Sequence, residues 1–323
     1  MRRYVIIGFD YGPAHELFRE VFNDEDVEFI RTPLKNPRRI TTRILMKLLR
    51  YHLVPTFALS SMFSEFLSFD QSEEIVFIYS NPWIEAMMRS GFLDMLKEHY
   101  PNAYHAAYLL DIHAARRLDI ENIKTSYDST TIFNEEEAES LGVDYLPAMC
   151  SNKDELILSH DEVFDLSFTG QAKERYAELI KVYKKLTAGG LTCHFYIIGV
   201  PKSEQYHAEG LFYGSELLTP EESLSYITSS KCLLEIQPCE TSALTLRVQE
   251  AVIYDKKLLT NNPSISKFKY YKPNMIQIYE DADTIDLDFF KSKKDSYSYQ
   301  GDYSPRVFLE SIYAQCKVEN TPG

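Results

Sequence analysis

A polar turn between a buried strand and a helix is the feature of this sequence best suited to hold an anionic ligand. The apolar run 232–236 predicts a short parallel strand, residues 238–242 interrupt it, and 244–254 carry helical spacing before a second strand at 257–260. The first N–H groups of a helix have no partner inside the helix, and the helix dipole places partial positive charge beside them. Together these features favour a phosphate group at the start of the helix.

Two charged side chains on this helix extend the predicted site. Arg247 and Glu250 lie three residues apart and therefore share one helical face. A diphosphate at the turn would meet Arg247, and a ribose would meet Glu250. The alternative is that the two side chains pair with each other on a solvated helix surface. The other candidate binding residues form the turn and its borders: Gln237, Thr241, Ser242, Ala243, Leu244 and Thr245.

A second candidate turn follows the apolar run 166–168. Gly170 would allow the backbone to approach a phosphate closely; the alternative is that it only marks a turn between a strand and a helix. Lys173 and Arg175 follow, and either could neutralise a leaving diphosphate while the other faces solvent. Tyr213 precedes the next predicted helix, where it could stack on a base; an ordinary partly buried tyrosine is the alternative.

These residues resemble the donor-binding unit of GT-B glycosyltransferases, especially small bacterial enzymes of capsule and lipopolysaccharide assembly. In that family a serine-glycine-leucine-threonine-like turn leads to an Arg and then to a Glu-Ala pair. The corresponding residues here are Ser242, Ala243, Leu244, Thr245, Arg247, Glu250 and Ala251. The resemblance also takes in Phe168-Thr169-Gly170 with Arg175, Asp111, and the segment 133–147. It covers about residues 105–280 and leaves the first hundred positions almost unmatched.

An inverting transfer of this kind needs a carboxylate or imidazole that takes the proton from an acceptor hydroxyl while the sugar C1–O bond breaks. Asp111 ends an apolar run and matches an aspartate of the resembling family, and His113 lies beside it. Asp10 and His15, in the first predicted strand-to-helix turn, are the other candidates. Asp111 could instead cap the following helix. Retaining members commonly carry a second Glu eight positions before the helical one; here that position is Ser242, which favours inversion.

The segment 31–50 is strongly basic, with seven Lys or Arg and no acid in a chain of net charge −14. Its apolar residues follow helical spacing, and the cationic face carries Arg39, Arg43, Lys47 and Arg50. With the apolar stretch 57–69, this pattern predicts a patch that contacts an anionic membrane or the phosphates of a lipid-linked acceptor. The alternative is a core-facing helix with a solvated basic face.

Strands alternate with helices along the chain, which predicts parallel sheets with right-handed crossovers. We expect an α/β fold with two Rossmann-like, doubly wound domains facing a cleft, the GT-B arrangement, and ligands at the carboxyl ends of the strands. The polar, acidic stretch 150–165 is the predicted boundary. The acceptor-side domain would then be 1–150 and the donor-binding domain 151–303, and a C-terminal helix and tail at 304–323 could pack back on the first domain.

Three individual helices are also predicted. The segments 14–22 and 82–100 each have the pattern of one helix. A third starts at Thr219, with proline in the first helical position and Glu222 placed for a capping box.

Composition and motifs argue against several other classes. The net charge of −14 disfavours nucleic-acid binding. The segment Gly8-Phe9-Asp10-Tyr11-Gly12 lacks the glycine spacing of a dinucleotide-binding fold. The five cysteines have no zinc-binding spacing and suggest reduced thiols. No segment has the ~20 apolar residues of a membrane span, and the N-terminal apolar run is too short for a signal peptide.

A metal-dependent GT-A enzyme would need an Asp-x-Asp motif after a strand. The two pairs of this spacing, Asp281 with Asp283 and Asp286 with Asp288, lie in an acidic stretch that is more typical of a solvated loop.

The sequence therefore predicts a metal-independent, inverting glycosyltransferase of the hexosyltransferase type that needs no cofactor. Its donor would be a UDP, GDP or dTDP sugar, and its acceptor a lipid-linked bacterial surface polysaccharide at the inner face of the cell membrane, on the cytoplasmic side. The alternative is a non-catalytic sugar-nucleotide sensor or assembly scaffold, which would bind a nucleotide diphosphate without turnover.

Overall fold

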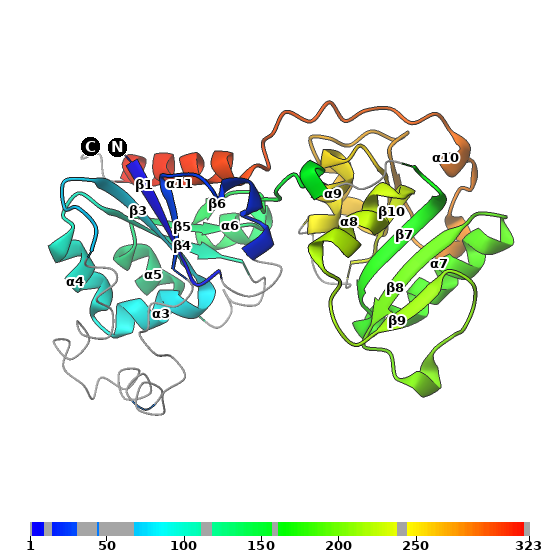
Figure 1. Cartoon of the computed structure of the whole chain (residues 1–323), viewed down its shortest axis with the longest axis horizontal. Coiled ribbons are helices and arrows are strands. Elements are labelled where there is room, and N and C mark those ends of the chain that lie inside the picture. The colour runs from blue at the N-terminus through cyan, green and yellow to red at the C-terminus, as the bar shows by residue number, and fades with distance from the viewer. Residues whose placement is uncertain are drawn as a thin grey trace. The chain divides into compact units, whose positions relative to one another are not determined.

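The protein forms two compact units, residues 1–151 with 303–323 and residues 152–302. The computed structural model describes residues 2–9, 15–30, 44, 68–110, 118–156, 161–237 and 244–319. In these residues each unit contains one six-stranded sheet in which every pair of neighbouring strands is parallel (Figure 1). The sheets and the helices between their strands confirm the predicted pair of Rossmann-like, doubly wound domains.

The first sheet has the strand order β2-β1-β3-β4-β5-β6. Its strands are β1 (Arg2–Ile7), β2 (Val27–Ile30), β3 (Glu74–Ser80), β4 (Tyr104–Leu109), β5 (Ser129–Ile132) and β6 (Asp144–Tyr145). The helices of this unit are α3 (Asn81–Arg89), α4 (Phe92–His99), α5 (Ile120–Ser126), α6 (Glu135–Leu141) and α11 (Pro305–Glu319). Helices α3, α4 and α5 cover one face of the sheet, and α11 covers the other (Figure 1).

Two predicted helices of the first unit are wrong in extent. The segment 82–100 forms two helices, α3 and α4, because Gly91 adopts a left-handed backbone with φ of +72°, which breaks the helical path. In the segment 14–22, the described part ends in a single 3-10 turn, η1 (Arg19–Val21). So short a segment gains little from helix propagation, and the packing of the Phe18 and Phe22 rings on Phe29 sets its shape instead.

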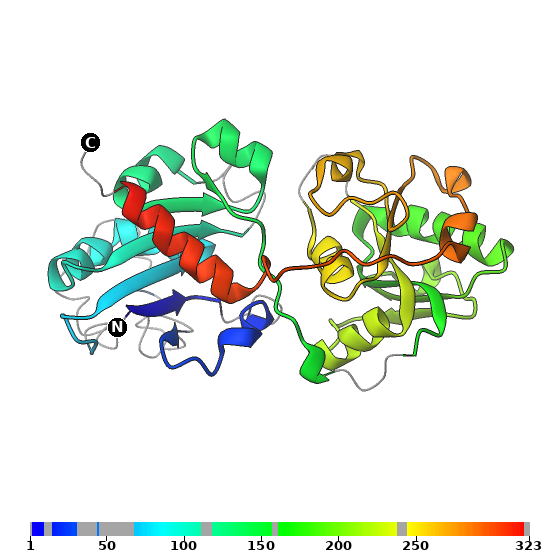
Figure 2. The ribbon, with the colours of Figure 1, turned by 90° about the horizontal axis from the view of Figure 1, so that it is seen from above.

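The C-terminal helix α11 packs on the first sheet, as predicted, and lies across its strands (Figure 2). Arg306 donates two hydrogen bonds to the Asp26 carboxylate, both 2.8 Å, and also pairs with Asp24. Phe308 contacts the ring of Tyr108 with centroids 4.6 Å apart. These contacts join residues 200 to 282 positions apart in the sequence, so the last helix is part of the first unit.

The second sheet has the strand order β12-β11-β10-β7-β8-β9. Its strands are β7 (Phe164–Gln171), β8 (Cys193–Ile198), β9 (Leu211–Gly214), β10 (Ser230–Glu235), β11 (Lys257–Thr260) and β12 (Ile276–Ile278). Its helices are α7 (Tyr176–Ala188), α8 (Pro220–Thr228), α9 (Leu246–Ile253) and the short α10 (Asp288–Lys291). The start of α8 is as predicted: the Thr219 hydroxyl accepts from the Glu222 N–H, and the Glu222 carboxylate accepts from the Thr219 N–H.

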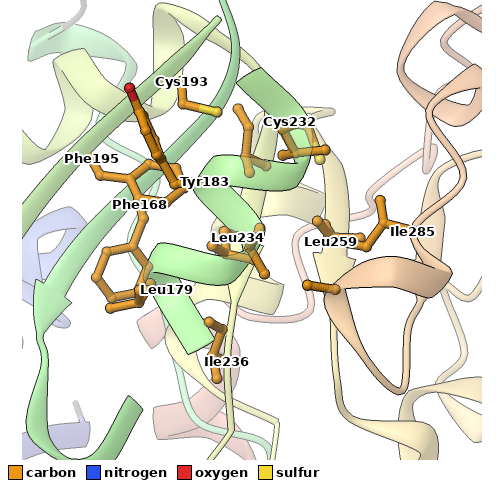
Figure 3. Packing of buried hydrophobic residues seen from close by; sticks show 14 of the residues in the cluster. Phe168, Leu179, Tyr183, Cys193, Phe195, Cys232, Leu234, Ile236, Leu259 and Ile285 are labelled. Carbon is orange, nitrogen blue, oxygen red and sulfur yellow. The ribbon is translucent and has the colours of Figure 1, made fainter. Parts of the chain in front are cut away.

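Side chains alternate along β10 between the two faces of this sheet. Cys232, Leu234 and Ile236 pack with Leu179 of α7 in one apolar cluster (Figure 3). Because successive side chains of a strand point to opposite faces of the sheet, the side chain of Glu235 lies on the other face, where α9 contacts β10. A carboxyl group therefore lies at the end of a buried strand, beside the helix predicted to bind phosphate.

Candidate functional site

The connection order of the second sheet locates a switch point. From β7 the chain builds β8 and β9 on one side, and it then crosses to build β10, β11 and β12 on the other side. The carboxyl ends of β7 and β10 thus adjoin at the point where the strand order reverses, which is where open α/β sheets bind ligands. Most of the described donor-site candidates belong to the segments that leave these two strands.

Arg247 connects α9 to the end of β7. Its guanidinium donates to the hydroxyl of Thr169 at 2.6 Å and to the Thr169 carbonyl at 3.2 Å. It also pairs with the Glu250 carboxylate at 2.9 Å. Both charged side chains are only 15% exposed, so this ion pair is not on a solvated helix surface. The phosphate role of Arg247 and the ribose role of Glu250 remain predictions.

Arg175 makes a second connection between the same strand ends. Its guanidinium donates to the carbonyl of Ile236, just beyond β10, at 2.8 Å and to the carbonyl of Gln171 at 2.6 Å. It also lies 5.8 Å from the centre of the Phe168 ring, and burial lowers the pKa of Arg175. The two arginines thus hold β7 against the segment between β10 and α9.

Lys173 and Gly170 differ from the expected turn. Gly170 lies inside β7, which continues to Gln171, so the turn begins later than the sequence predicts. Lys173 is exposed and has a left-handed backbone with φ of +43°. Because such a conformation costs a non-glycine residue about 1–3 kcal/mol, the connection from β7 to α7 is strained beside the switch point.

The sequence does not predict a role for Glu235, although a single acid in the apolar run 232–236 is a visible signal. Its carboxyl group is 3% exposed, and burial raises its pKa. It accepts hydrogen bonds from the Thr245 hydroxyl, from the Thr260 hydroxyl at 2.7 Å and from the Gln237 amide at 3.4 Å. All three donors are neutral side chains at the carboxyl edge of the sheet or the start of α9.

The segment after β10 is also tied to the end of β11. The backbone N–H of Gln237 donates to the Asn261 side chain at 2.7 Å, and the Asn261 amide donates back to the Gln237 carbonyl at 3.2 Å. Gln237 is buried, at 6% exposure, so its backbone is fixed before the turn begins. Leu244 and Thr245 resume the described chain at half-buried positions. Thr241, Ser242 and Ala243 lie outside the described residues.

Tyr213 lies in β9, two strands from the switch point. Its hydroxyl donates to the Tyr206 carbonyl at 2.8 Å and lies 3.0 Å from the Tyr176 hydroxyl. Burial raises the pKa of Tyr213. A base stacked on Tyr213 would have to extend across the end of β8, so the structure does not bring this residue to Arg247 and Glu250.

The catalytic candidates belong to the first unit. Asp10, Asp111 and His113 lie outside the described residues. The imidazole of His15 stacks on Phe22 with centroids 4.2 Å apart. The basic patch candidates Arg39, Arg43, Lys47 and Arg50 also lie outside the described residues.

The two Asp-x-Asp pairs act as local caps. Asp281 accepts a hydrogen bond from the Asp283 N–H at 3.0 Å, and Asp286 accepts from the Asp288 N–H at 2.9 Å. Within the described ranges, no three His, Cys, Asp or Glu side chains are grouped to hold a metal ion. The helices of those ranges also lack the length and apolar content needed to cross a bilayer.

Comparison with known proteins shows the fold. The sequence matches no protein-family model and no curated protein. The catalytic domain of starch synthase IV from Arabidopsis thaliana, bound to ADP and acarbose, is a similar solved structure with 7% identity and a TM-score of 0.53, over 98% of this chain and 99% of that chain. UDP-GlcNAc 2-epimerase from Neisseria meningitidis, bound to UDP-GlcNAc, has 6% identity and a TM-score of 0.49, over 97% and 100%. A glycotransferase of kitacinnamycin has 10% identity and a TM-score of 0.41, over 98% and 95%.

At these identities the likeness concerns the fold alone. Of the three structures, starch synthase IV is the one whose TM-score exceeds 0.5. Together with the two parallel sheets, this likeness shows that the chain has the GT-B type of fold.

Proposed function

We propose that this protein is a glycosyltransferase that transfers a sugar from a nucleotide-diphosphate donor to a hydroxyl group of an acceptor glycan. The observation that carries the proposal is the switch point between β7 and β10, where the start of α9 meets the two arginines, Arg175 and Arg247. A similar fold binds ADP in starch synthase IV, which supports a nucleoside diphosphate as the donor group.

In this proposal the diphosphate lies at the start of α9. The helix dipole and the first N–H groups attract its negative charge, and Lys173 and Arg247 neutralise the charge that builds on the leaving diphosphate. The ion pair with Arg247 uses Oε2 of Glu250, so a ribose hydroxyl would donate to Oε1. Positive side chains would thereby neutralise the leaving diphosphate, as a metal ion does in other glycosyltransferases.

The proposed transfer is an inverting displacement. Asp111 takes the proton of the acceptor hydroxyl, the acceptor oxygen bonds to C1 of the sugar, and the C1–O bond to the diphosphate breaks with its electron pair. The basic segment 31–50 supports a lipid-linked bacterial surface glycan at the inner face of the membrane, with the protein on the cytoplasmic side.

A thermal-shift screen with UDP, GDP, dTDP and CMP tests the donor site and identifies the base. One diphosphate at a hundredfold excess over its Kd should stabilise the folded chain by about 2.7 kcal/mol. In a unit of this size that stabilisation raises the Tm by roughly 5–10 °C. The matching monophosphate is the control and should stabilise less. If none of the four nucleotides shifts the transition, the donor site proposed here does not exist.

A transfer assay tests the chemistry. Asp111→Asn should abolish transfer and keep nucleotide binding, since the carboxylate would touch only the acceptor hydroxyl. Asp119→Asn is a matched control in the same unit, because Asp119 caps α5 and has no proposed part in the reaction. Near-normal turnover of Asp111→Asn removes it as the base. If the wild type binds the nucleotide but transfers no sugar to any acceptor tested, the result would favour the sensor alternative.

A further inference from the structure

The hydroxyl of Thr245 is used in an unusual way at the start of α9. Thr245 is the N-cap residue, and a threonine in this position normally accepts a hydrogen bond from the backbone N–H groups of the first turn. Here its side chain makes no cap hydrogen bond. It donates instead to Oε1 of Glu235. The side-chain cap that the sequence provides is thus missing, and the Val248 N–H donates to the Thr245 backbone carbonyl at 3.0 Å instead.

Glu235 is held in a fixed place by its other contacts. Its second oxygen, Oε2, accepts from the Thr260 hydroxyl at the end of β11, at 2.7 Å. The Gln237 amide approaches Oε1 at 3.4 Å. Because the carboxyl group lies at the end of β10 and is 3% exposed, it links two neighbouring strand ends to the start of α9.

Such a carboxyl group is costly to bury. The side chains that donate to it are neutral, and although the charge of Arg175 attracts it, the carboxylate loses more solvation on burial than these partners restore. A leucine or valine at this position would fill the same strand at no such cost, and the neighbours Leu233 and Leu234 are apolar. Departures of this kind from ordinary core chemistry are found mainly at functional sites.

We propose that Glu235 is a positioning residue for the donor site: it draws the Thr245 hydroxyl away from the helix and fixes the amino-terminal turn of α9, so that its N–H groups face an anionic ligand instead of a cap. This inference rests on the proposed function for the identity of that ligand, a nucleoside diphosphate. The geometry of the turn itself can be tested without any ligand.

The first test measures exchange of the backbone amides of α9 in the free protein. Glu235→Ala and Thr245→Val each remove one side of the Glu235–Thr245 contact, so amides 244–248 should exchange at least about tenfold faster, while Thr245→Ser should behave like the wild type. Lys257→Met is the matched control. Lys257 is also a buried charged residue of this sheet, but it lies at the opposite end of β11 and donates to the carbonyls of Phe289 and Ser292.

The second test measures affinity by titration with UDP, GDP and dTDP and with uridine, guanosine and thymidine. Glu235→Ala and Thr245→Val should bind the diphosphate that the wild type prefers at least about tenfold more weakly, with nucleoside affinity changed less than about twofold. Glu235→Gln keeps one of the two hydroxyl contacts and should fall between these variants and the wild type. Lys257→Met should bind as the wild type does, even though its second unit is less stable.

The outcomes separate the two proposals. If the wild type binds none of the nucleotides but Glu235→Ala speeds exchange at 244–248, the donor function fails and the positioning of α9 stands. If folded Glu235→Ala and Thr245→Val bind the diphosphate as tightly as the wild type, or if Lys257→Met weakens binding equally, Glu235 is not a positioning residue. Unchanged exchange in both variants would overturn the inference without reference to any ligand.

Discussion

Arg247→Ala is the substitution whose effect the structure predicts most sharply. It removes the two hydrogen bonds to Thr169 and the ion pair with Glu250. The Glu250 side chain is only 15% exposed, so its carboxylate would remain largely buried without its partner. Removing one member of such a pair leaves an uncompensated charge and costs more than the pair itself contributes.

The expected loss of stability is about 2–3 kcal/mol, since a hydrogen bond to a charged group contributes about 1.5–3 kcal/mol and the contacts are not additive. Lys181→Ala is a matched control, because Lys181 and Glu178 have the same three-residue spacing in α7 at 3.7 Å. Lys181 is 60% exposed, and its removal should cost less than about 0.5 kcal/mol. In the double variant Arg247→Ala with Glu250→Ala, about 1–2 kcal/mol of the loss should be recovered.

Urea unfolding followed by two signals can assign this loss to the second unit. Trp83 is the single tryptophan and lies in α3 of the first unit, so its emission follows that unit, whereas circular dichroism follows both. With a slope of about 2 kcal/mol per molar urea, the transition of the second unit should move down by about 1–1.5 M, and the Trp83 transition should not move. A shift no larger than that of Lys181→Ala would refute the reasoning, because the buried Arg247–Glu250 pair would then contribute no more than an exposed pair.

Two further predictions concern strain and pH. Lys173→Gly should change the free energy of unfolding by less than about 1 kcal/mol, because relief of the left-handed backbone offsets the flexibility of glycine. The same variant should bind the diphosphate more weakly. Ser298→Gly is the control at a second exposed left-handed position, and it should show the same change in stability without the loss of affinity. Burial lowers the pKa of His105 to about 3, against about 6.5 in the unfolded chain, so its contribution to stability is complete above pH 6.5 and is lost as the pH falls towards 3. Between pH 6.5 and 5 the free energy of unfolding, measured by Trp83 emission, should fall by about 2 kcal/mol because of His105. A His105→Phe variant that loses as much stability over this pH range would contradict the prediction.

The fold class could be predicted from the sequence because apolar runs and helical spacing alternate along most of the chain. The two edge strands of the second sheet, β9 and β12, could not, since neither contains the consecutive aliphatic residues that marked the equally short strand 257–260. The break at Gly91 was also not predicted, because a glycine within a helical pattern marks a helix end only when its backbone is left-handed.

The site was predicted in part. Helical spacing places Arg247 and Glu250 on one face, but the partner Thr169 lies 78 residues away, and only the pairing of β7 with β10 brings it near. The same holds for Glu235, whose partners Thr245 and Thr260 are 10 and 25 residues away. Contacts of this range depend on strand order, which the sequence pattern alone does not specify.

Hydrogen exchange of the full-length wild type with and without a saturating nucleoside diphosphate tests the central claim most directly. If the diphosphate lies at the switch point, amides 169–175 and 244–250 should exchange more slowly in its presence, because the ligand covers the ends of β7 and the start of α9. Bound nucleotide that protects only the first unit, or leaves both of these segments unchanged, would contradict the claim.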